Sequence, residues 1–235
     1  MSVTTVLFDL DGTLLPMDQD VFIKAYFTRI AAKVAPAGYD PKELIDMIWR
    51  GTGVMVKNDG SRTNEKAFWE YAVSVYGDRI LQDKGYFDEF YRVDFGNIRS
   101  VCGYDPAAAQ IVHGLKDRGF RVVLATNPFF PARATQWRIQ WAGLSPEDFE
   151  LYTTYENSSY CKPNLRYYEA ILEQLQVQPQ ECLMVGNDVG EDMIAEQLGM
   201  QVFLLTDCLI NKADADISRY PQGNFGDLQK YLENL

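Results

Sequence analysis

The 235-residue chain contains a single histidine, His113, and four widely spaced cysteines that form no Cys-x-x-Cys pair. Without clusters of these residues, neither a zinc site nor serine–histidine catalysis is favoured. His113 falls in a segment, 107–119, with the apolar spacing of a helix, and we expect it to have a structural role. Any chemistry carried out by this chain must therefore use other side chains.

Positive charge is also scarce, and no basic run is present. The 22 Lys and Arg residues face 33 Asp and Glu, so the net charge is −11. This balance argues against binding to nucleic acid or to an anionic membrane surface. No apolar run approaches the length of a transmembrane helix, and the N-terminus has neither a basic region nor a cleavable apolar segment. We expect a cytoplasmic protein that is a monomer or a weak homodimer.

Hydrophobic residues, in contrast, make up 47% of the chain and occur in alternating strand-like and helix-like segments. Short apolar runs predict strands at 4–8, 121–125, 150–153, 182–185 and 201–205. Helical spacing predicts helices at 107–118, 131–142, 165–175 and 191–198. Glycines stand where three of these helices should end: Gly119, Gly143 and Gly199. This alternation predicts an α/β fold with a parallel sheet.

The long interval after the first predicted strand contains only helical patterns, at 20–35, 41–50, 64–76 and 86–95. We therefore expect a helical cap subdomain over 17–100, inserted into an α/β core formed by 1–16 and 101–235. An insert that leaves and rejoins the sheet at the carboxyl ends of its strands can form a lid over a pocket there. Four charged cap residues are expected to be solvated: Arg50, Lys57, Arg62 and Lys66.

The segment from Val6 to Leu15 is the most informative part of the chain. Its apolar run ends at Asp9 and Asp11, which are followed by a glycine and a threonine. A strand would point both carboxylates the same way, and their charges repel unless a cation lies between them. An acidic turn would explain Asp11 but not Asp9, which interrupts the apolar run and would be buried unpaired. Mg²⁺, which takes oxygen ligands from carboxylates, water and phosphate, is the expected ion.

Polar residues follow other predicted strands in the same way. Thr126 and Asn127 come after the second strand, and Asp188 and Asp192 come after the fourth. Lys162 stands in the turn before the helix at 165–175. Taken singly, Thr126 is an ordinary strand-end or helix-capping hydroxyl and Lys162 an ordinary loop lysine. Because ligands of parallel sheets bind beyond the carboxyl ends of the strands, the combination predicts a metal and phosphate site.

With these motifs in this order, the chain resembles the haloacid dehalogenase superfamily, in the subgroup of phosphatases with a helical cap after the first strand. The resemblance covers essentially the whole length and implies a doubly wound, Rossmann-like sheet with strand order 3-2-1-4-5. It implies that Asp9 is the nucleophile and that Asp11 is the general acid and then the base. Mg²⁺ would be bound by the Asp9 carboxylate, the Asp11 backbone carbonyl and the Asp188 side chain.

The same resemblance assigns phosphate binding to Thr126, to the backbone amide of Asn127 and to Lys162, with Thr126 and Lys162 also counted as catalytic. Asp192 would orient Lys162 or a metal-bound water, or simply favour a helix N-terminus. Glu191 is expected only to favour a helix N-terminus. Asn187 replaces an aspartate that many cap-bearing relatives carry, which alters the surroundings of the metal and not its ligands.

We expect a magnesium-dependent phosphatase that hydrolyses a small phosphorylated metabolite, a phosphate monoester, through an aspartyl-phosphate. The acid at Asp11 favours phosphoryl transfer, because a departing halide needs no proton. Two alternatives remain open: a phosphomutase of the same superfamily, and a noncatalytic regulatory protein that binds a phosphorylated ligand. Four aromatic residues are candidates for the substrate pocket, although core packing is favoured for most: Trp49, Trp69, Phe129 and Phe130.

Overall fold

The computed structural model describes residues 2–235, which are built around a six-stranded parallel sheet. Its strands are β1 (Thr5–Phe8), β2 (Arg121–Leu124), β3 (Leu151–Tyr152), β4 (Cys182–Gly186), β5 (Gln201–Leu205) and β6 (Gln222–Gly223). They lie in the order β3-β2-β1-β4-β5-β6. The predicted order is confirmed, and β6 is added at the edge. The apolar pattern missed β6 because its two residues carry no apolar side chain.

Helices cover both faces of the sheet, as the doubly wound fold requires. They are α6 (Pro106–Asp117), α7 (Ala132–Trp141), α8 (Leu165–Leu175) and α9 (Phe225–Glu233), with short 3₁₀ helices η3 (Pro146–Asp148), η4 (Pro179–Glu181) and η5 (Met193–Leu198). Alternate residues of β1 serve opposite faces. Val6 and Phe8 belong to the apolar cluster that includes α6, α7 and α9, whereas Leu7 belongs to the cluster of α8 and η5. The central strand is thus buried on both sides.

The last predicted core helix differs from expectation. Segment 191–198 forms the 3₁₀ helix η5 in place of an α-helix, and it begins only at Met193. The residues before it are drawn into a turn, because the backbone N–H of Asp192 donates to the carbonyl of Asp188 at 2.9 Å. The three glycines that were predicted to end helices, Gly119, Gly143 and Gly199, all have a positive φ.

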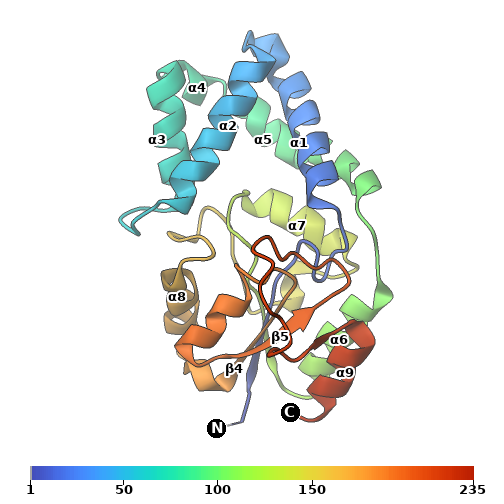
Figure 1. Ribbon diagram of the computed structural model, residues 1–235. Helices are drawn as coiled ribbons and strands as arrows, with labels where there is room; N and C mark the ends of the chain where they lie inside the picture. The colour runs from blue at the N-terminus through green and yellow to red at the C-terminus, as the bar shows by residue number, and fades with distance from the viewer. Residues whose placement is uncertain (1) are drawn as a thin grey trace.

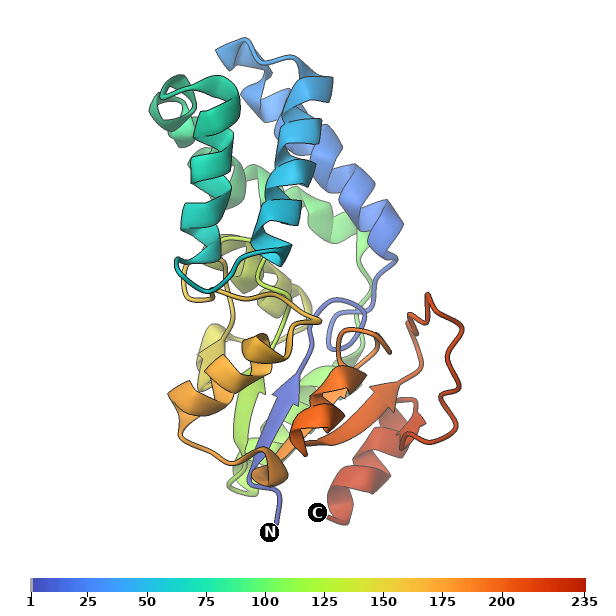
Figure 2. The same cartoon turned by 60° about the vertical axis from the view of Figure 1, so that its left-hand side comes forward.

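Between β1 and α6, residues 18–101 form helices and turns and no strand. The insert consists of α1 (Gln19–Val34), η1 (Ala35–Ala37), α2 (Pro41–Val56), α3 (Asn64–Tyr76), α4 (Arg79–Gln82), α5 (Lys84–Arg92) and η2 (Asp94–Val101). It stands over the carboxyl ends of the strands, on the side of the core away from both termini (Figures 1 and 2). Helix α2 continues to Val56, beyond the predicted end at residue 50, and α4 lies in a stretch where no helix was predicted.

The two segments that join the insert to the core lie side by side. Met17 forms an isolated antiparallel bridge with Cys102, and the N–H of Gly103 donates to the carbonyl of Pro16 at 2.7 Å. These contacts fall near the predicted limits of the cap at 17 and 100. The division into 1–16 with 101–235 and 17–100 itself stays a prediction.

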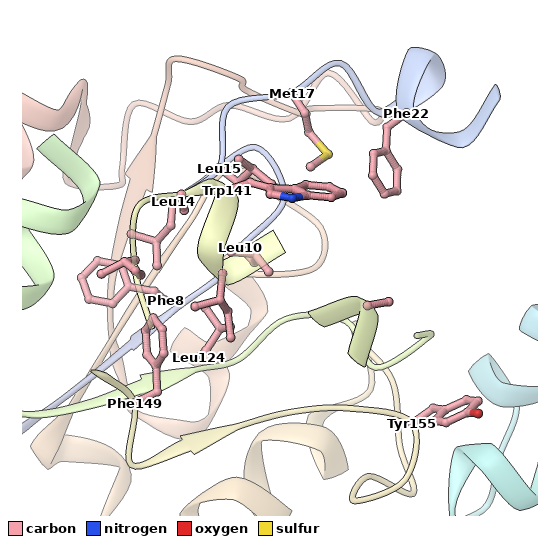
Figure 3. Packing of buried hydrophobic residues seen from close by; sticks show 14 of the residues in the cluster. Phe8, Leu10, Leu14, Leu15, Met17, Phe22, Leu124, Trp141, Phe149 and Tyr155 are labelled. Atoms are coloured by element: carbon pink, nitrogen blue, oxygen red, sulfur yellow. The ribbon is translucent and has the colours of Figure 1, made fainter. Parts of the chain in front are cut away.

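One apolar cluster runs from the sheet into the insert. Figure 3 shows part of it, from Phe8 on β1 to Met17 and Phe22 at the start of the insert. Phe95 of η2 stacks on Trp141 of α7 with ring centroids 5.5 Å apart. Because a fully buried side chain of this size contributes about 1.5–3 kcal/mol, this packing holds the insert over the strand ends. Among residues 2–235, no helix has the length and apolar character needed to cross a membrane.

Candidate active site

Asp9 and Asp11 follow β1 at its carboxyl end, where a tight loop reverses the chain. The N–H of Asp9 still donates to the backbone of β4 at 2.9 Å, so the sheet fixes this residue. The loop is closed by a hydrogen bond of 2.8 Å from the N–H of Gly12 to the carbonyl of Leu15. Gly12 has a φ of 89°, and a Cβ atom there would overlap the side-chain amide of Asn187. Glycine is therefore required at this position for both conformation and space.

Lys162 connects carboxylates that come from two different strands. Its Nζ lies 2.8 Å from Asp9 Oδ1 and 2.7 Å from Asp192 Oδ1. The lysine is 1% exposed, and the two aspartates are buried with it. Burial opposes the charge on Lys162, but the negative charges of Asp192 and Asp9 outweigh it and raise the pKa of Lys162 well above its ordinary value. The three residues form a buried, charged triad.

Asp192 holds both the lysine and the start of the loop after β4. While Oδ1 accepts from Lys162, Oδ2 accepts from the backbone N–H of Asp188 at 2.9 Å. A Cβ atom at Gly186 would overlap the Asp192 carboxylate, so this approach depends on glycine at the end of β4. Burial raises the pKa of Asp192 to about 7. The positive charge of Lys162 opposes this shift, and the negative charge of Asp9 adds to it. Of the roles expected for Asp192, these contacts suit the orientation of Lys162.

Asp11 pairs with an arginine, Arg138, for which the sequence predicted no role. Arg138 of α7 is fully buried, and its Nη1 contacts Asp11 Oδ2. Asp11 Oδ1 is buried and has no hydrogen-bond partner within residues 2–235. Burial raises the pKa of Asp11 above its ordinary value; Arg138 opposes this shift and Asp9 adds to it. The signal was present in the sequence, since Arg138 lies at helical spacing with Ala134 and Trp141, on the buried face of α7.

Thr126 and Asn127 follow β2 and lie on the wall of the same cavity as the two aspartates. The carbonyl of Thr126 accepts hydrogen bonds from Thr153 Oγ1 at 2.6 Å and from the Tyr167 hydroxyl at 2.8 Å. These bonds fix the turn that carries both residues. The hydroxyl of Thr126 and the backbone N–H of Asn127 are thereby placed at the strand end, where the phosphate site was expected.

Two residues that follow β4, Glu191 and Asn187, make contacts that the sequence did not predict. Glu191, expected only to favour a helix N-terminus, accepts a hydrogen bond of 2.9 Å from Asn127 Nδ2, and burial raises its pKa. Asn187 accepts from Thr13 Oγ1 at 2.9 Å and donates to the carbonyl of Cys208 at 2.6 Å. An amide can do both, whereas an ionised aspartate could only accept. Asn187 therefore ties the loop after β1 to the segment after β5.

All these strand ends meet at one cavity of about 210 Å³. The residues that line it include Asp9, Asp11, Thr126, Asn127, Asp188 and Asp192, with Lys162 buried behind Asp9. Lys212, from the segment after β5, also lies on its wall, and no sequence pattern marked that residue. His113 lies on α6, away from this cavity, and is exposed, with its Nε2 3.2 Å from Asp148 Oδ2; its structural role stays a prediction.

The oxygen donors at this cavity fit Mg²⁺. Within residues 2–235 no three His, Cys, Asp or Glu side chains are grouped so as to hold a metal ion by themselves. The predicted set needs only the carboxylates of Asp9 and Asp188 and the carbonyl of Asp11, and Mg²⁺ typically keeps several waters beside one or two carboxylates. Asp188 Oδ1 accepts from the N–H groups of Gly190 and Glu191 at 2.8 and 3.0 Å, which orients this carboxylate.

Comparison with known proteins gives a consistent result. Residues 3–198 match the family described as haloacid dehalogenase-like hydrolases. Phosphoglycolate phosphatase of Vibrio vulnificus (strain YJ016) is 24% identical over 204 residues, which cover 87% of this chain and 84% of that protein. Pyrophosphatase PpaX of Bacillus cereus (strain G9842) is 26% identical over 198 residues, which cover 84% of this chain and 80% of that protein. The HAD-hydrolase YfnB of Bacillus subtilis, whose crystal structure has bound magnesium, shares the fold with a TM-score of 0.56 and 16% identity over 99% of each chain.

Proposed function

The chain belongs to the haloacid dehalogenase-like hydrolases, and from that premise we propose that it is a magnesium-dependent phosphatase acting on a small phosphate monoester through an aspartyl-phosphate. The observation that carries this proposal is the position of Lys162 between Asp9 and Asp192 at a cavity also lined by Asp11. A carboxylate can approach a dianionic phosphate only if fixed positive charge offsets their repulsion. The buried ammonium supplies part of that charge.

In the first step, a carboxylate oxygen of Asp9 bonds to phosphorus while the bond between phosphorus and the ester oxygen breaks. Lys162, the Thr126 hydroxyl and the N–H of Asn127 hold the phosphoryl oxygens. Asp11 gives its proton to the departing alkoxide, which leaves as an alcohol. The products of this step are the aspartyl-phosphate and a deprotonated Asp11.

In the second step, Asp11 takes a proton from water as the water oxygen bonds to phosphorus and displaces the Asp9 carboxylate. Inorganic phosphate leaves, and Asp11 is protonated again. The raised pKa of Asp11 supports this role, because the acid must hold a proton when the ester binds. Since Arg138 contacts Oδ2, the unpartnered Oδ1 is the oxygen that we assign to proton transfer.

Mg²⁺ would be held by the Asp9 carboxylate, the Asp11 carbonyl and the Asp188 side chain. When bound, the ion neutralises negative charge around the phosphoryl group. Asp192 would act from behind this set, because it contacts both Lys162 and the backbone of Asp188. Its part is to position these groups and not to touch the substrate.

The cap, residues 17–100, would close over the phosphate site and exclude water during the first step. Its packing on α7 through Phe95 and Trp141 supports this arrangement. The core of 1–16 and 101–235 would carry all the groups that take part in the chemistry.

A panel of phosphate esters tests the proposal. Phosphoglycolate and pyrophosphate belong in it because the two relatives are named for them, together with sugar phosphates. Native protein and the Asp9→Asn variant are each incubated with Mg²⁺ and the panel, and free phosphate is measured. We expect phosphate from the native protein alone. An isomerised sugar phosphate without release would favour a phosphomutase, and tight binding without turnover would favour a regulatory protein.

The covalent step has a separate test. Fluoroberyllate mimics a phosphoryl group bonded to a carboxylate, and its adduct is detected by ¹⁹F NMR. We expect an adduct in native protein with Mg²⁺ and in Asp11→Asn, and none in Asp9→Asn. Absence of an adduct in metal-saturated native protein would remove Asp9 as the nucleophile.

A further inference from the structure

A second cavity, of about 170 Å³, lies within the helical insert beside the candidate active site. Its walls come from α1, α2, α3 and α5 and from three core residues, Phe129, Phe130 and Tyr155. In Figure 3, Tyr155 lies next to helices of the insert. Fourteen residues line this cavity, of which ten are aromatic and none is charged. Such walls can bury an apolar group but offer no partner to a charged one.

The two cavities share one wall, formed by Ile23, Phe129 and Phe130. The ring centroid of Phe130 lies 4.7 Å from the guanidinium carbon of Arg138, whose side chain pairs with Asp11. The wall between the cavity lined by Asp11 and the apolar cavity therefore includes a ring that stacks on the arginine paired with the proposed acid. A group that receives its proton from Asp11 would extend past Phe130 into that cavity.

Three hydroxyl groups on the cavity walls are hydrogen-bonded to protein atoms, whereas the buried Nε1 of Trp69 has no hydrogen-bond partner within residues 2–235. Thr52 Oγ1 donates to the carbonyl of Ile48 at 3.0 Å, and the hydroxyls of Tyr26 and Tyr91 are hydrogen-bonded at 2.8 Å. An occupant of the cavity would thus meet mostly ring faces, ring edges and aliphatic carbon.

Three cationic residues of the cap, Arg50, Arg62 and Lys66, are paired with carboxylates of α2 and α3. Arg50 Nε lies 2.9 Å from Asp46, and Arg62 Nη1 lies 3.1 Å from Glu70, which Lys66 approaches at 3.9 Å. None of these residues lines the cavity. A leaving group with its own carboxylate, such as glycolate, would lose its hydration there and find no cation.

From these contacts we propose that the cap cavity binds the leaving group of the substrate, and that the substrate is the phosphate monoester of an apolar alcohol bearing a ring of about benzene size. An apolar cavity of about 150 Å³ is sufficient to bind benzene. Aromatic walls add edge-to-face contacts that favour a ring over a straight chain. This inference rests on the proposed function and adds the class of substrate.

Binding of the leaving alcohol alone tests the cavity without any catalysis. Trp49 and Trp69 line it, so intrinsic fluorescence reports its occupancy. Titration with benzyl alcohol should give a saturable change in native protein, and glycolate should give none. Thr52→Phe, which fills the cavity, should weaken benzyl alcohol binding at least about tenfold. Thr52→Val, which removes only the hydroxyl, and Val56→Phe, at an exposed residue one turn further along the same helix and outside the cavity, should bind as native protein does.

Hydrolysis tests the assignment to the leaving group. Benzyl phosphate is the probe, because its alkoxide needs the proton of Asp11, as that of phosphoglycolate does. We expect kcat/KM for benzyl phosphate to exceed that for phosphoglycolate at least about tenfold. Thr52→Phe should remove this preference, whereas Val56→Phe, at an exposed residue that lines neither cavity, should retain it. Trp49→Ala, at a cavity-lining side chain that is 58% exposed, should reduce the preference in part.

The outcomes separate this inference from the proposed function. Comparable kcat/KM values for benzyl phosphate and phosphoglycolate, or no effect of Thr52→Phe on either assay, would overturn the inference while hydrolysis stands. Saturable benzyl alcohol binding with no phosphate released from any ester would overturn the proposed function, and the leaving-group assignment with it.

Discussion

The cavity at the strand ends carries the carboxylates of Asp9, Asp11 and Asp188, whereas the cavity of the insert, which begins on the other side of Phe130, has no charged wall residue. The first is built from residues far apart in the sequence that the parallel sheet brings to one edge. The second is built mainly from one continuous stretch of helices. Two neighbouring spaces thus differ in how they are assembled and in what they can bind.

This difference separates reactivity from selectivity. Charged groups at the first cavity depend on one another, because Lys162 is shared by Asp9 and Asp192 and each ion is buried. A change to any of them disturbs the rest. Side chains of the second cavity contact each other through apolar surfaces, so volume-conserving changes there are tolerated far better. Selectivity can therefore change in the insert while the chemistry at the strand ends is preserved.

The largest effect should follow from Asp9→Asn. Loss of the proposed nucleophile should reduce phosphate release at least about 10³-fold for every ester, whether its leaving group is polar or apolar. Benzyl alcohol should still change the tryptophan fluorescence with native affinity. Steady-state kinetics and the same titration measure both. A variant that lost only the apolar esters would contradict the division between the two cavities.

Arg138→Met should destabilise the fold by about 3–5 kcal/mol at pH 7.5, because it leaves the buried Asp11 carboxylate without its partner. Protonation of Asp11 removes that charge, so the cost should shrink as the pH falls. Urea unfolding at two pH values measures the effect. Arg133→Met is the matched control, since Arg133 is exposed on the same helix and only stacks on Trp137; it should cost less than about 1 kcal/mol. Equal losses for the two variants would argue that the buried pair has no special importance.

Mg²⁺ should stabilise the protein more as the pH rises from about 5 to 7.5. Burial raises the pKa of Asp11, Glu191 and Asp192, the last to about 7. The folded state therefore holds protons that the unfolded chain has released above pH 4 to 5, and the stability of metal-free protein should fall as the pH rises through this window. Lys162 adds nothing to the slope, because its raised pKa keeps it protonated throughout.

The charge of a bound Mg²⁺ would favour the ionised form of these nearby carboxyls, so its stabilising effect should grow by about 1 kcal/mol or more across the window. Thermal unfolding with EDTA or excess Mg²⁺ at each pH gives the difference. Benzyl alcohol, which meets no titrating carboxylate, should stabilise equally at all these pH values. A magnesium effect independent of pH would contradict the proposal that the ion is bound close to these three buried carboxyl groups.

The smallest effect is expected for Lys212→Ala. This exposed lysine lies on the wall of the charged cavity, so its removal should raise KM about two- to fivefold. The change should diminish at high salt, which screens exposed charges. Lys57→Ala, an exposed lysine of the insert that lines neither cavity, is the control and should leave KM unchanged. Affinity for benzyl alcohol should be the same in all three proteins.

Much of the charged cavity was predictable, because most of its carboxylates follow a strand whose apolar run is evident in the sequence. Asp9 and Asp11 were identified in this way, as were Thr126 and Asp188. Arg138 was missed because one arginine in a helix is normally solvated, and only its helical register suggested burial. Lys212 carried no signal, since the segment after β5 has neither a regular apolar period nor a motif.

The apolar cavity was much less predictable. Trp49, Trp69, Phe129 and Phe130 were recognised as candidates, yet core packing was favoured for most of them, and all four line the cavity. Sequence periodicity tells which face of a helix is apolar, but it cannot tell whether that face is filled by a neighbouring helix or leaves a space. The difference depends on how α1, α2, α3 and α5 are inclined to one another.

The sequence by itself determined the alternation of strands and helices, the helical insert and the order of polar groups along the chain, because these follow from local apolar periods and from residues that end them. Tertiary structure alone decided that Arg138 meets Asp11, that Asp192 and Asp9 share one lysine, and that ten aromatic residues leave a cavity open. Contacts of this kind join residues distant in the chain, and their geometry is set by how whole elements pack.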